Sequence, residues 1–167
     1  NNMKIHPEAM LGNVTDGFKT FLKTLTSGRI SLAALAVGTA LGAYKKALQY
    51  ATEREAFGKP IYKFQSIGFK LADMATEIEA AKLMVYYAAW LKDQGIRFTK
   101  QAAMAKLFAS EVAMKSTIEA IQVFGGYGYV KENDVERFFR DAKILEIGEG
   151  TSEIQRLIII REILKHF

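Results

Sequence analysis

The sequence predicts an all-α chain, folded as a four-helix up-and-down bundle. Half of the 167 residues are apolar, and there are only two prolines, Pro7 and Pro60. Long stretches consist of Ala, Leu, Ile, Met, Lys and Glu, which favour helix. In these stretches apolar residues recur at steps of three and four, so that each helix has one apolar face. Four helices with matched apolar faces bury them by forming a bundle.

The first two predicted helices cover about 30–51 and 64–88. The apolar stripe of the first consists of Ile30, Ala34, Val37, Leu41, Tyr44, Leu48 and Ala51. The stripe of the second consists of Phe64, Ile67, Leu71, Met74, Ile78, Ala81, Val85 and Ala88. Pro60, which cannot donate a backbone hydrogen bond, is expected to end the connection between them.

A third helix is predicted over 99–124 and a fourth from about Ser152. The third is expected to bury Leu107, Phe108, Val112, Ile118 and Ile121, and to carry Glu111, Lys115 and Glu119 on an exposed, ion-paired face. In the fourth, Ser152 and Gln155 have the spacing of a capping box. Its expected buried residues are Ile154, Leu157, Ile158 and Leu164. A shorter amphipathic piece, 135–142, lies between the two.

Composition narrows the possible partners. The net charge is +5, but the basic residues are interspersed with acidic ones, so we expect no nucleic-acid binding, whereas a phosphate-bearing cofactor is compatible. The uncharged run 30–44 is shorter than the ~18–20 residues that a membrane span needs. The chain has no cysteine and shows no secretory leader. A cytoplasmic location is therefore the expectation, and the opening without Met suggests a piece of a longer protein.

Metal and triad chemistry are not expected. A di-iron bundle needs Glu-x-x-His pairs on facing helices, but the only histidines are His6 and His166, near the termini. The lack of a central histidine also argues against Ser-His-Asp and Cys-His nucleophiles.

Glu149 is the candidate catalytic residue. It lies between Gly148 and Gly150, directly before the predicted helix start, where a flexible backbone lets a substrate approach the carboxylate. The alternative is a charge that favours the helix N-terminus, worth ~0.3–1 kcal/mol. Spacing alone leaves both interpretations open.

Two further motifs also have two interpretations. The string 122–129, Gln-Val-Phe-Gly-Gly-Tyr-Gly-Tyr, contains a glycine C-cap and could also present bare backbone amides to a phosphate. Arg54 could stabilise a helix C-terminus or clamp a phosphate with its forked donors.

Three motifs, 54–58, 122–126 and 148–156, occur in the order in which flavin-dependent acyl-CoA dehydrogenases carry them. The likeness runs over nearly the whole chain, so the chain resembles the C-terminal helical domain of that family. In the family an N-terminal helical domain and a middle β domain precede this segment. The resemblance thus implies that 1–167 is a single C-terminal domain, with 1–15 a linker from a middle domain missing from this chain.

The resemblance implies a reaction. A glutamate removes the α-proton of an acyl-CoA thioester while the β-hydrogen leaves as hydride to FAD, which gives the trans-2-enoyl-CoA. By this likeness Glu149 is the base. Some members carry the glutamate on the first long helix instead, where this chain has Gly28. Electrons would pass to an electron-transfer flavoprotein.

The resemblance also assigns the binding residues. The residues that match FAD contacts are Arg54, Phe57, Gln65, Gln122, Phe124, Gly125, Gly126, Thr151 and Glu153. Arg29 and Gly150 match substrate contacts. Because the family shares each cofactor between subunits, the resemblance implies a homo-oligomer, a dimer or a tetramer, in the bacterial cytoplasm or in the mitochondrial matrix of a eukaryote.

Departures from the family pattern leave alternatives open. Thr26 replaces an aspartate of many members, and Gly148 replaces a tyrosine whose loss would enlarge the acyl pocket. The acyl chain length is therefore open. The chain alone could also be an inactive bundle for oligomerisation and cofactor covering, or part of a flavin oxidase or monooxygenase on the same scaffold.

Overall fold

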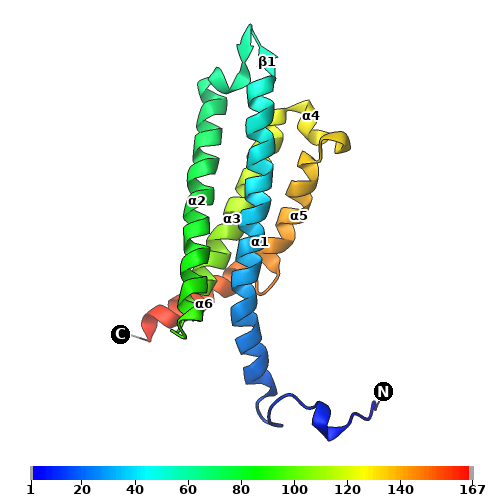
Figure 1. The fold of residues 1–167 in the computed structure, drawn as a ribbon, viewed down its shortest axis with the longest axis vertical. Coiled ribbons are helices and arrows are strands. Elements are labelled where there is room, and N and C mark those ends of the chain that lie inside the picture. The colour runs from blue at the N-terminus through cyan, green and yellow to red at the C-terminus, as the bar shows by residue number, and fades with distance from the viewer. Residues whose placement is uncertain (1, 166–167) are drawn as a thin grey trace.

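The computed structural model describes residues 2–165 and confirms the all-α bundle (Figure 1). Its helices are α1 (Gly17–Glu53), α2 (Gln65–Asp93), α3 (Thr99–Phe124), α4 (Gly126–Tyr129), α5 (Val135–Ile147) and α6 (Ser152–Leu164). Short 3-10 turns cover Pro7–Ala9, Ile61–Lys63 and Lys131–Asn133. The strands β1 (Glu55–Ala56) and β2 (Lys59–Pro60) pair antiparallel in a small hairpin between α1 and α2.

The four long helices of the bundle are α1, α2, α3 and α5, which run alternately up and down (Figure 1). The fourth position thus belongs to α5, which extends the predicted amphipathic piece 135–142 as far as Ile147. The helix expected to be fourth, α6, crosses one end of the bundle. The hairpin and α4 lie at the opposite end.

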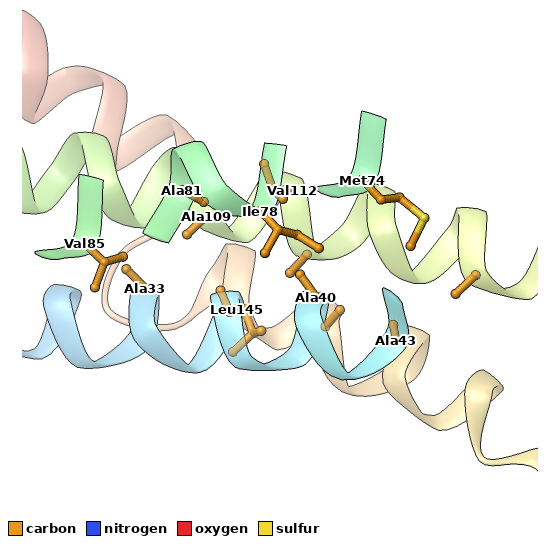
Figure 2. Packing of buried hydrophobic residues seen from close by; sticks show 14 of the residues in the cluster. Ala33, Ala40, Ala43, Met74, Ile78, Ala81, Val85, Ala109, Val112 and Leu145 are labelled. Carbon is orange, nitrogen blue, oxygen red and sulfur yellow. The ribbon is translucent and has the colours of Figure 1, made fainter. Parts of the chain in front are cut away.

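A stripe of alanines forms the core face of α1. Its fully buried members are Ala33, Ala36, Ala40, Ala43, Ala47 and Ala51. They pack with buried alanines of α3 and with Leu145 of α5 in one core cluster (Figure 2). The predicted stripe was partly wrong, because Ala34 and Leu48 are exposed. Alanine at the contact lets helix axes approach closely, so the smallest apolar residues define this face and the larger ones flank it.

The prediction for α2 is confirmed from Leu71 onward. Its buried residues are Leu71, Met74, Ile78, Ala81, Val85, Ala88 and Leu91. Figure 2 shows Met74, Ile78 and Val85 turned toward the α1 alanines. Steps of three and four therefore located the buried face correctly, although the other side of α2 also exposes large apolar and aromatic residues, among them Leu83, Tyr87 and Trp90.

The prediction for α3 is right in its bounds and wrong in part of its faces. Val112 is buried, but Ile118 is exposed. The expected ion-paired face does not pair with itself: Lys115 pairs with Glu77 of α2, and Glu119 pairs with Lys70 of α2. Glu111 pairs with Arg156 of α6, so all three residues of this face find their partners on other helices.

The prediction for α6 was mostly wrong. Ile154, Leu157 and Leu164 are exposed, while Gln155 and Glu162 are buried. Because α6 crosses the bundle end, its inward positions meet polar groups. Glu162, for example, accepts two hydrogen bonds from Arg97, at 2.9 and 2.8 Å.

α1 has the length and the apolar composition that a membrane span requires, with a mean hydropathy of 1.2 over its most apolar window. Core helices of soluble proteins share this property. That the chain has no membrane-spanning helix therefore stays a prediction.

Candidate functional site

The loop between α5 and α6 holds Glu149 in a left-handed backbone conformation. Glu149 has a φ of 55° and Gly150 a φ of 96°. Gly148, which ends α5, has an ordinary φ of −60°, so only one of the two flanking glycines uses its conformational freedom. A residue with a Cβ pays roughly 1–2 kcal/mol for this region, so the surrounding structure must hold the loop in place.

The Glu149 carboxylate lies against α1 at Gly28. A Cβ at Gly28 would lie 2.6 Å from Glu149 Oε2 and 2.8 Å from its Cδ. The position at which some family members carry their base is thus in contact with the carboxylate of Glu149. Among the described residues, the buried Oε2 has no hydrogen-bond partner. An unpaired buried carboxylate oxygen is costly, and a catalytic role is one of the explanations for such an atom.

Arg29, the next residue on α1, belongs to the same group. Its side chain is only 5% exposed, and Nη1 donates to Thr26 Oγ1 at 3.3 Å. Burial lowers the pKa of Arg29, and the negative charge of Glu149 opposes that shift. The structure therefore brings a predicted base and a predicted substrate-binding cation together from opposite ends of the sequence.

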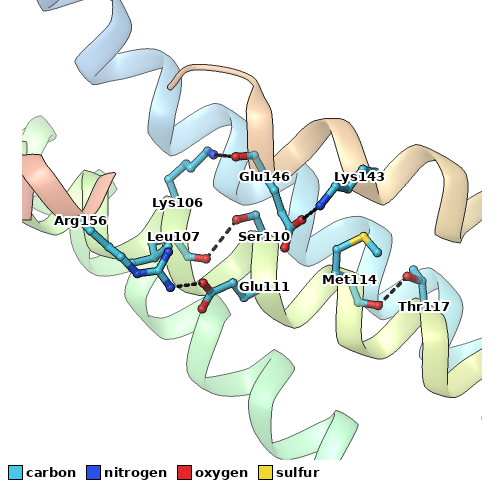
Figure 3. Close-up of polar contacts among 9 residues, drawn as sticks. All are labelled: Lys106, Leu107, Ser110, Glu111, Met114, Thr117, Lys143, Glu146 and Arg156. Atoms are coloured by element: carbon cyan, nitrogen blue, oxygen red, sulfur yellow. Dashed lines mark hydrogen bonds and ion pairs between the residues drawn. The ribbon is translucent and has the colours of Figure 1, made fainter. Parts of the chain in front are cut away.

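Two buried side chains hold this loop, Lys106, which was not predicted as a site residue, and Gln155, which was predicted only as a capping-box residue. Lys106 of α3 is 0% exposed, and Nζ donates to Glu146 O at 3.0 Å and to Gly150 O at 2.9 Å. Figure 3 shows the contact with Glu146. Gln155 Nε2 donates to Glu149 O at 3.1 Å and to Gly150 O at 2.8 Å. Burial lowers the pKa of Lys106, an effect that Glu146 opposes. The available signal was a lysine set among alanines on the core face of α3.

The predicted capping box of α6 is not present, although the helix is capped. The N-cap is Thr151, whose Oγ1 accepts from Ile154 N at 3.4 Å, and Gln155 turns toward the loop. The pKa of Glu153 lies below its ordinary value, because its own backbone N–H and the Thr151 side chain hydrogen bond to the carboxylate. Thr151 and Glu153 therefore lie beside Glu149 in sequence and in space.

A second group of predicted site residues lies at the other end of the bundle. Arg54, where α1 ends, lines a cavity of about 570 Å³ together with Gln122, Phe124, Gly125 and Gly126. The guanidinium carbon of Arg54 is 5.9 Å from the ring centroid of Tyr127. Five of the predicted cofactor residues, from two distant parts of the sequence, thus share one cavity.

The glycine turn of this cavity is open. Gly125 has a φ of 60° and a ψ of −137°, which only glycine adopts readily, and it caps α3 as predicted. A Cβ at Gly125 or Gly126 would meet nothing within 4 Å. The Phe124 ring is largely buried and stacks on Tyr50 with centroids 4.1 Å apart. Phe124 therefore forms the floor of the cavity.

Phe57 and Gln65 do not line this cavity. Phe57, at the hairpin tip, is 96% exposed, and its ring contacts Phe64 edge-on with centroids 6.2 Å apart. Gln65 is exposed at the start of α2. Both lie at the same end of the bundle as Arg54 (Figure 1).

The two groups are far apart within one chain. Arg29 lies in α1 and Arg54 is the C-cap of that helix, and 25 residues of α-helix span about 37 Å. The forked cation, open glycine turn and aromatic rings at the Arg54 end fit a ligand that carries phosphate and flat rings. The Glu149 end offers a proton acceptor beside a buried cation.

No group of three or more possible metal ligands occurs among residues 2–165.

Known proteins have similar sequences and a similar fold. The family described as acyl-CoA dehydrogenase, C-terminal domain, matches residues 15–164. A probable acyl-CoA dehydrogenase of Bacillus subtilis, YngJ, is 59% identical over 98% of this chain and 43% of its own length. Butyryl-CoA dehydrogenase from Megasphaera elsdenii superimposes with a TM-score of 0.95, at 51% identity over 96% of this chain and 42% of that one.

A structure of PigA with FAD and proline is also similar, with a TM-score of 0.94 at 34% identity over 98% of this chain and 43% of that one. The chain therefore spans about two fifths of the length of the proteins it matches. Because the family match covers most of the sequence, this chain belongs to the acyl-CoA dehydrogenase family, as its C-terminal domain.

Proposed function

We propose that this chain is the C-terminal domain of an FAD-dependent acyl-CoA dehydrogenase, in which Glu149 removes the α-proton of the acyl-CoA thioester. The observation that carries the proposal is the Glu149 carboxylate, buried against Gly28 with Oε2 unpaired, on a loop that keeps its backbone in a left-handed conformation. A general base needs a lone pair that is free to accept a proton, and no hydrogen bond within residues 2–165 occupies Oε2.

The other residues take supporting roles. Arg29 and Gly150 contact the substrate, and Arg29 also places a cation near the carboxylate. Arg54, Gln122, Gly125 and Gly126 hold the phosphate and adenine portion of FAD, with Phe57 and Gln65 beside them, while Thr151 and Glu153 contact the cofactor next to the base. When bound, FAD accepts the β-hydrogen as a hydride, so that the product is the trans-2-enoyl-CoA and the flavin is reduced.

The separation of about 37 Å between the two groups supports a cofactor shared between copies of the chain. In this arrangement, the Arg54 cavity of one copy serves the Glu149 loop of another in a homo-oligomer, a dimer or a tetramer. The electron acceptor proposed from the resemblance is an electron-transfer flavoprotein. Gly148, next to the base, leaves room beside the acyl chain.

The test is anaerobic reduction of the flavin by butyryl-CoA in the complete flavoprotein that carries this domain. Glu149→Gln should keep its FAD and lose the bleaching of the flavin band. Glu136→Gln is the matched control, because Glu136 is a carboxylate on α5 that pairs with Arg140 at 2.6 Å, away from the loop. It should be reduced like the parent protein.

Full reduction of the Glu149→Gln protein would refute the assignment of the base. The same experiment separates the alternatives. A complete protein whose reduced flavin reoxidises in air within a turnover would favour an oxidase. The inactive bundle is an alternative for the chain alone, and a purified chain of residues 1–167 that binds no added FAD would favour it.

A further inference from the structure

A buried lysine of α3 contacts the loop of the base from inside the bundle. Lys106 is a fully buried, long side chain, and its neighbours on the buried side of α3 are small residues, Ala102, Ala103, Ala109 and Ser110. Both of its hydrogen-bond acceptors are main-chain carbonyls, Glu146 O and Gly150 O. An ammonium is costly to bury unless it is hydrogen-bonded, so these two contacts are what keep it in place.

The two acceptors lie on either side of Glu149. Glu146 O belongs to the last turn of α5, where carbonyls lack partners within the helix and a cation is favourable. Gly150 O follows the base directly. One ammonium thus ties the segment before Glu149 to the segment after it.

Gln155 completes the arrangement from α6. Its amide donates to Glu149 O and to Gly150 O, so the carbonyls of the base and of its neighbour are both fixed. A Cβ at Gly150 would lie 2.9 Å from Gln155 Nε2, which shows how closely this side chain packs on the loop. A left-handed conformation at Glu149 persists only where the surrounding structure holds the backbone in it. The hydrogen bonds from Lys106 and Gln155 hold the backbone here.

We propose that Lys106, together with Gln155, is a positioning residue for Glu149: its buried ammonium joins Glu146 O to Gly150 O and thereby fixes the backbone that aims the carboxylate. The inference rests on the proposed function of Glu149 and adds to it a side chain that need not touch substrate or cofactor. A displacement of about 1 Å at a reacting group can cost ~100-fold in rate, so a small relaxation of the loop is enough to be measured.

The experiment compares three variants of the complete flavoprotein. Lys106→Met keeps the length of the side chain and removes the donor, and Gln155→Met does the same from α6. Lys115→Met is the matched control on α3, because Lys115 is exposed and pairs with Glu77 of α2. Each is measured for flavin content, for anaerobic flavin reduction across a range of butyryl-CoA concentrations, and for amide hydrogen exchange of residues 148–151.

Lys106→Met should retain its flavin and its half-saturating butyryl-CoA concentration, while the limiting rate of reduction falls by ~10-fold or more. Exchange at residues 148–151 should be faster, and Lys115→Met should match the parent in every readout. An unchanged limiting rate, or unchanged exchange, in Lys106→Met would overturn the inference. If Lys106→Met does not fold, Gln155→Met decides by the same criteria.

Failure of the proposed function is distinguishable from failure of this inference. If Glu149→Gln is reduced at the full rate, the base is wrong, and the exchange data alone report whether Lys106 holds the loop. If Glu149→Gln is inactive while Lys106→Met is reduced normally, the base stands and the positioning role is refuted.

Discussion

Replacing Gly28 by alanine should separate catalysis from stability. Glycine in the middle of α1 costs about 1 kcal/mol relative to alanine, so the substitution should favour the helix. The new Cβ would lie 2.6 Å from Glu149 Oε2, about 0.8 Å short of the 3.4 Å at which ordinary contact begins. Since the carboxylate is the end of a side chain, it should move instead of the helices.

The magnitude follows from that displacement. A shift of nearly 1 Å at the base should lower the rate of flavin reduction by ~10–100-fold. The assay is anaerobic stopped-flow reduction of the complete flavoprotein by butyryl-CoA, with thermal unfolding measured on the same sample. The melting temperature should stay equal or rise.

Gly38→Ala is the matched control. Gly38 lies on the same helix, is exposed, and a Cβ there would meet nothing within 4 Å. It should show the same gain in helix stability with an unchanged rate. A Gly28→Ala protein that is reduced at the parent rate would refute the claim that the base works from this position against α1.

Three further predictions concern other parts of the structure. Arg54→Ala should lower the FAD content of the purified complete protein without lowering the melting temperature of the FAD-free protein; normal flavin content would favour a helix-capping role. Ala40→Leu should destabilise the chain by about 1–3 kcal/mol in urea unfolding, because the core has no room there; no loss would contradict the close α1–α3 packing. Burial raises the pKa of Glu162, but hydrogen bonds from Lys165 and Arg97 outweigh it and hold that pKa below its ordinary value of 4.5. This pairing stabilises the fold above pH 4.5, and the stabilisation is lost as the pH falls through the folded pKa. Glu162→Gln should therefore lower the free energy of unfolding by about 1–2 kcal/mol at pH 7 and by progressively less below pH 4. An equal loss at pH 7 and pH 3 in urea unfolding would contradict the ion pair.

The fold class and the bounds of α3 could be predicted, because spacing and glycine stops are local signals. The start of α1 could not, because α1 begins at Gly17, 13 residues before the predicted apolar stripe, and α2 runs on to Asp93. Gly125 ends α3 where the C-cap pattern indicated. Which face is buried was harder to predict. α1 is apolar on several sides, and the choice of the alanine stripe depends on how closely α3 approaches, which is a tertiary property.

The sequence allowed the residues of the candidate site to be predicted, but not their contacts or their arrangement in space. Glu149 stood out by its neighbours, and the family likeness supplied the list of contacts. Lys106 was not predicted as a site residue, and Gln155 was predicted only as a capping-box partner. Their acceptors are main-chain carbonyls of the last turn of α5 and of the loop before α6, and no spacing rule reports such contacts. The separation of the Glu149 group and the Arg54 group at opposite ends of the bundle likewise became visible only in the structure.

The most direct test of the account is subunit complementation between Arg54→Ala and Glu149→Gln. Each variant of the complete protein is purified alone, the two are unfolded and refolded together, and flavin reduction by butyryl-CoA is measured at limiting FAD. If the Arg54 cavity of one copy serves the Glu149 loop of another, mixed oligomers contain some fully intact sites, and the mixture should recover activity that neither variant has alone. A mixture as inactive as the separate variants, with mixed oligomers demonstrated, would contradict a site shared between the two ends of the bundle.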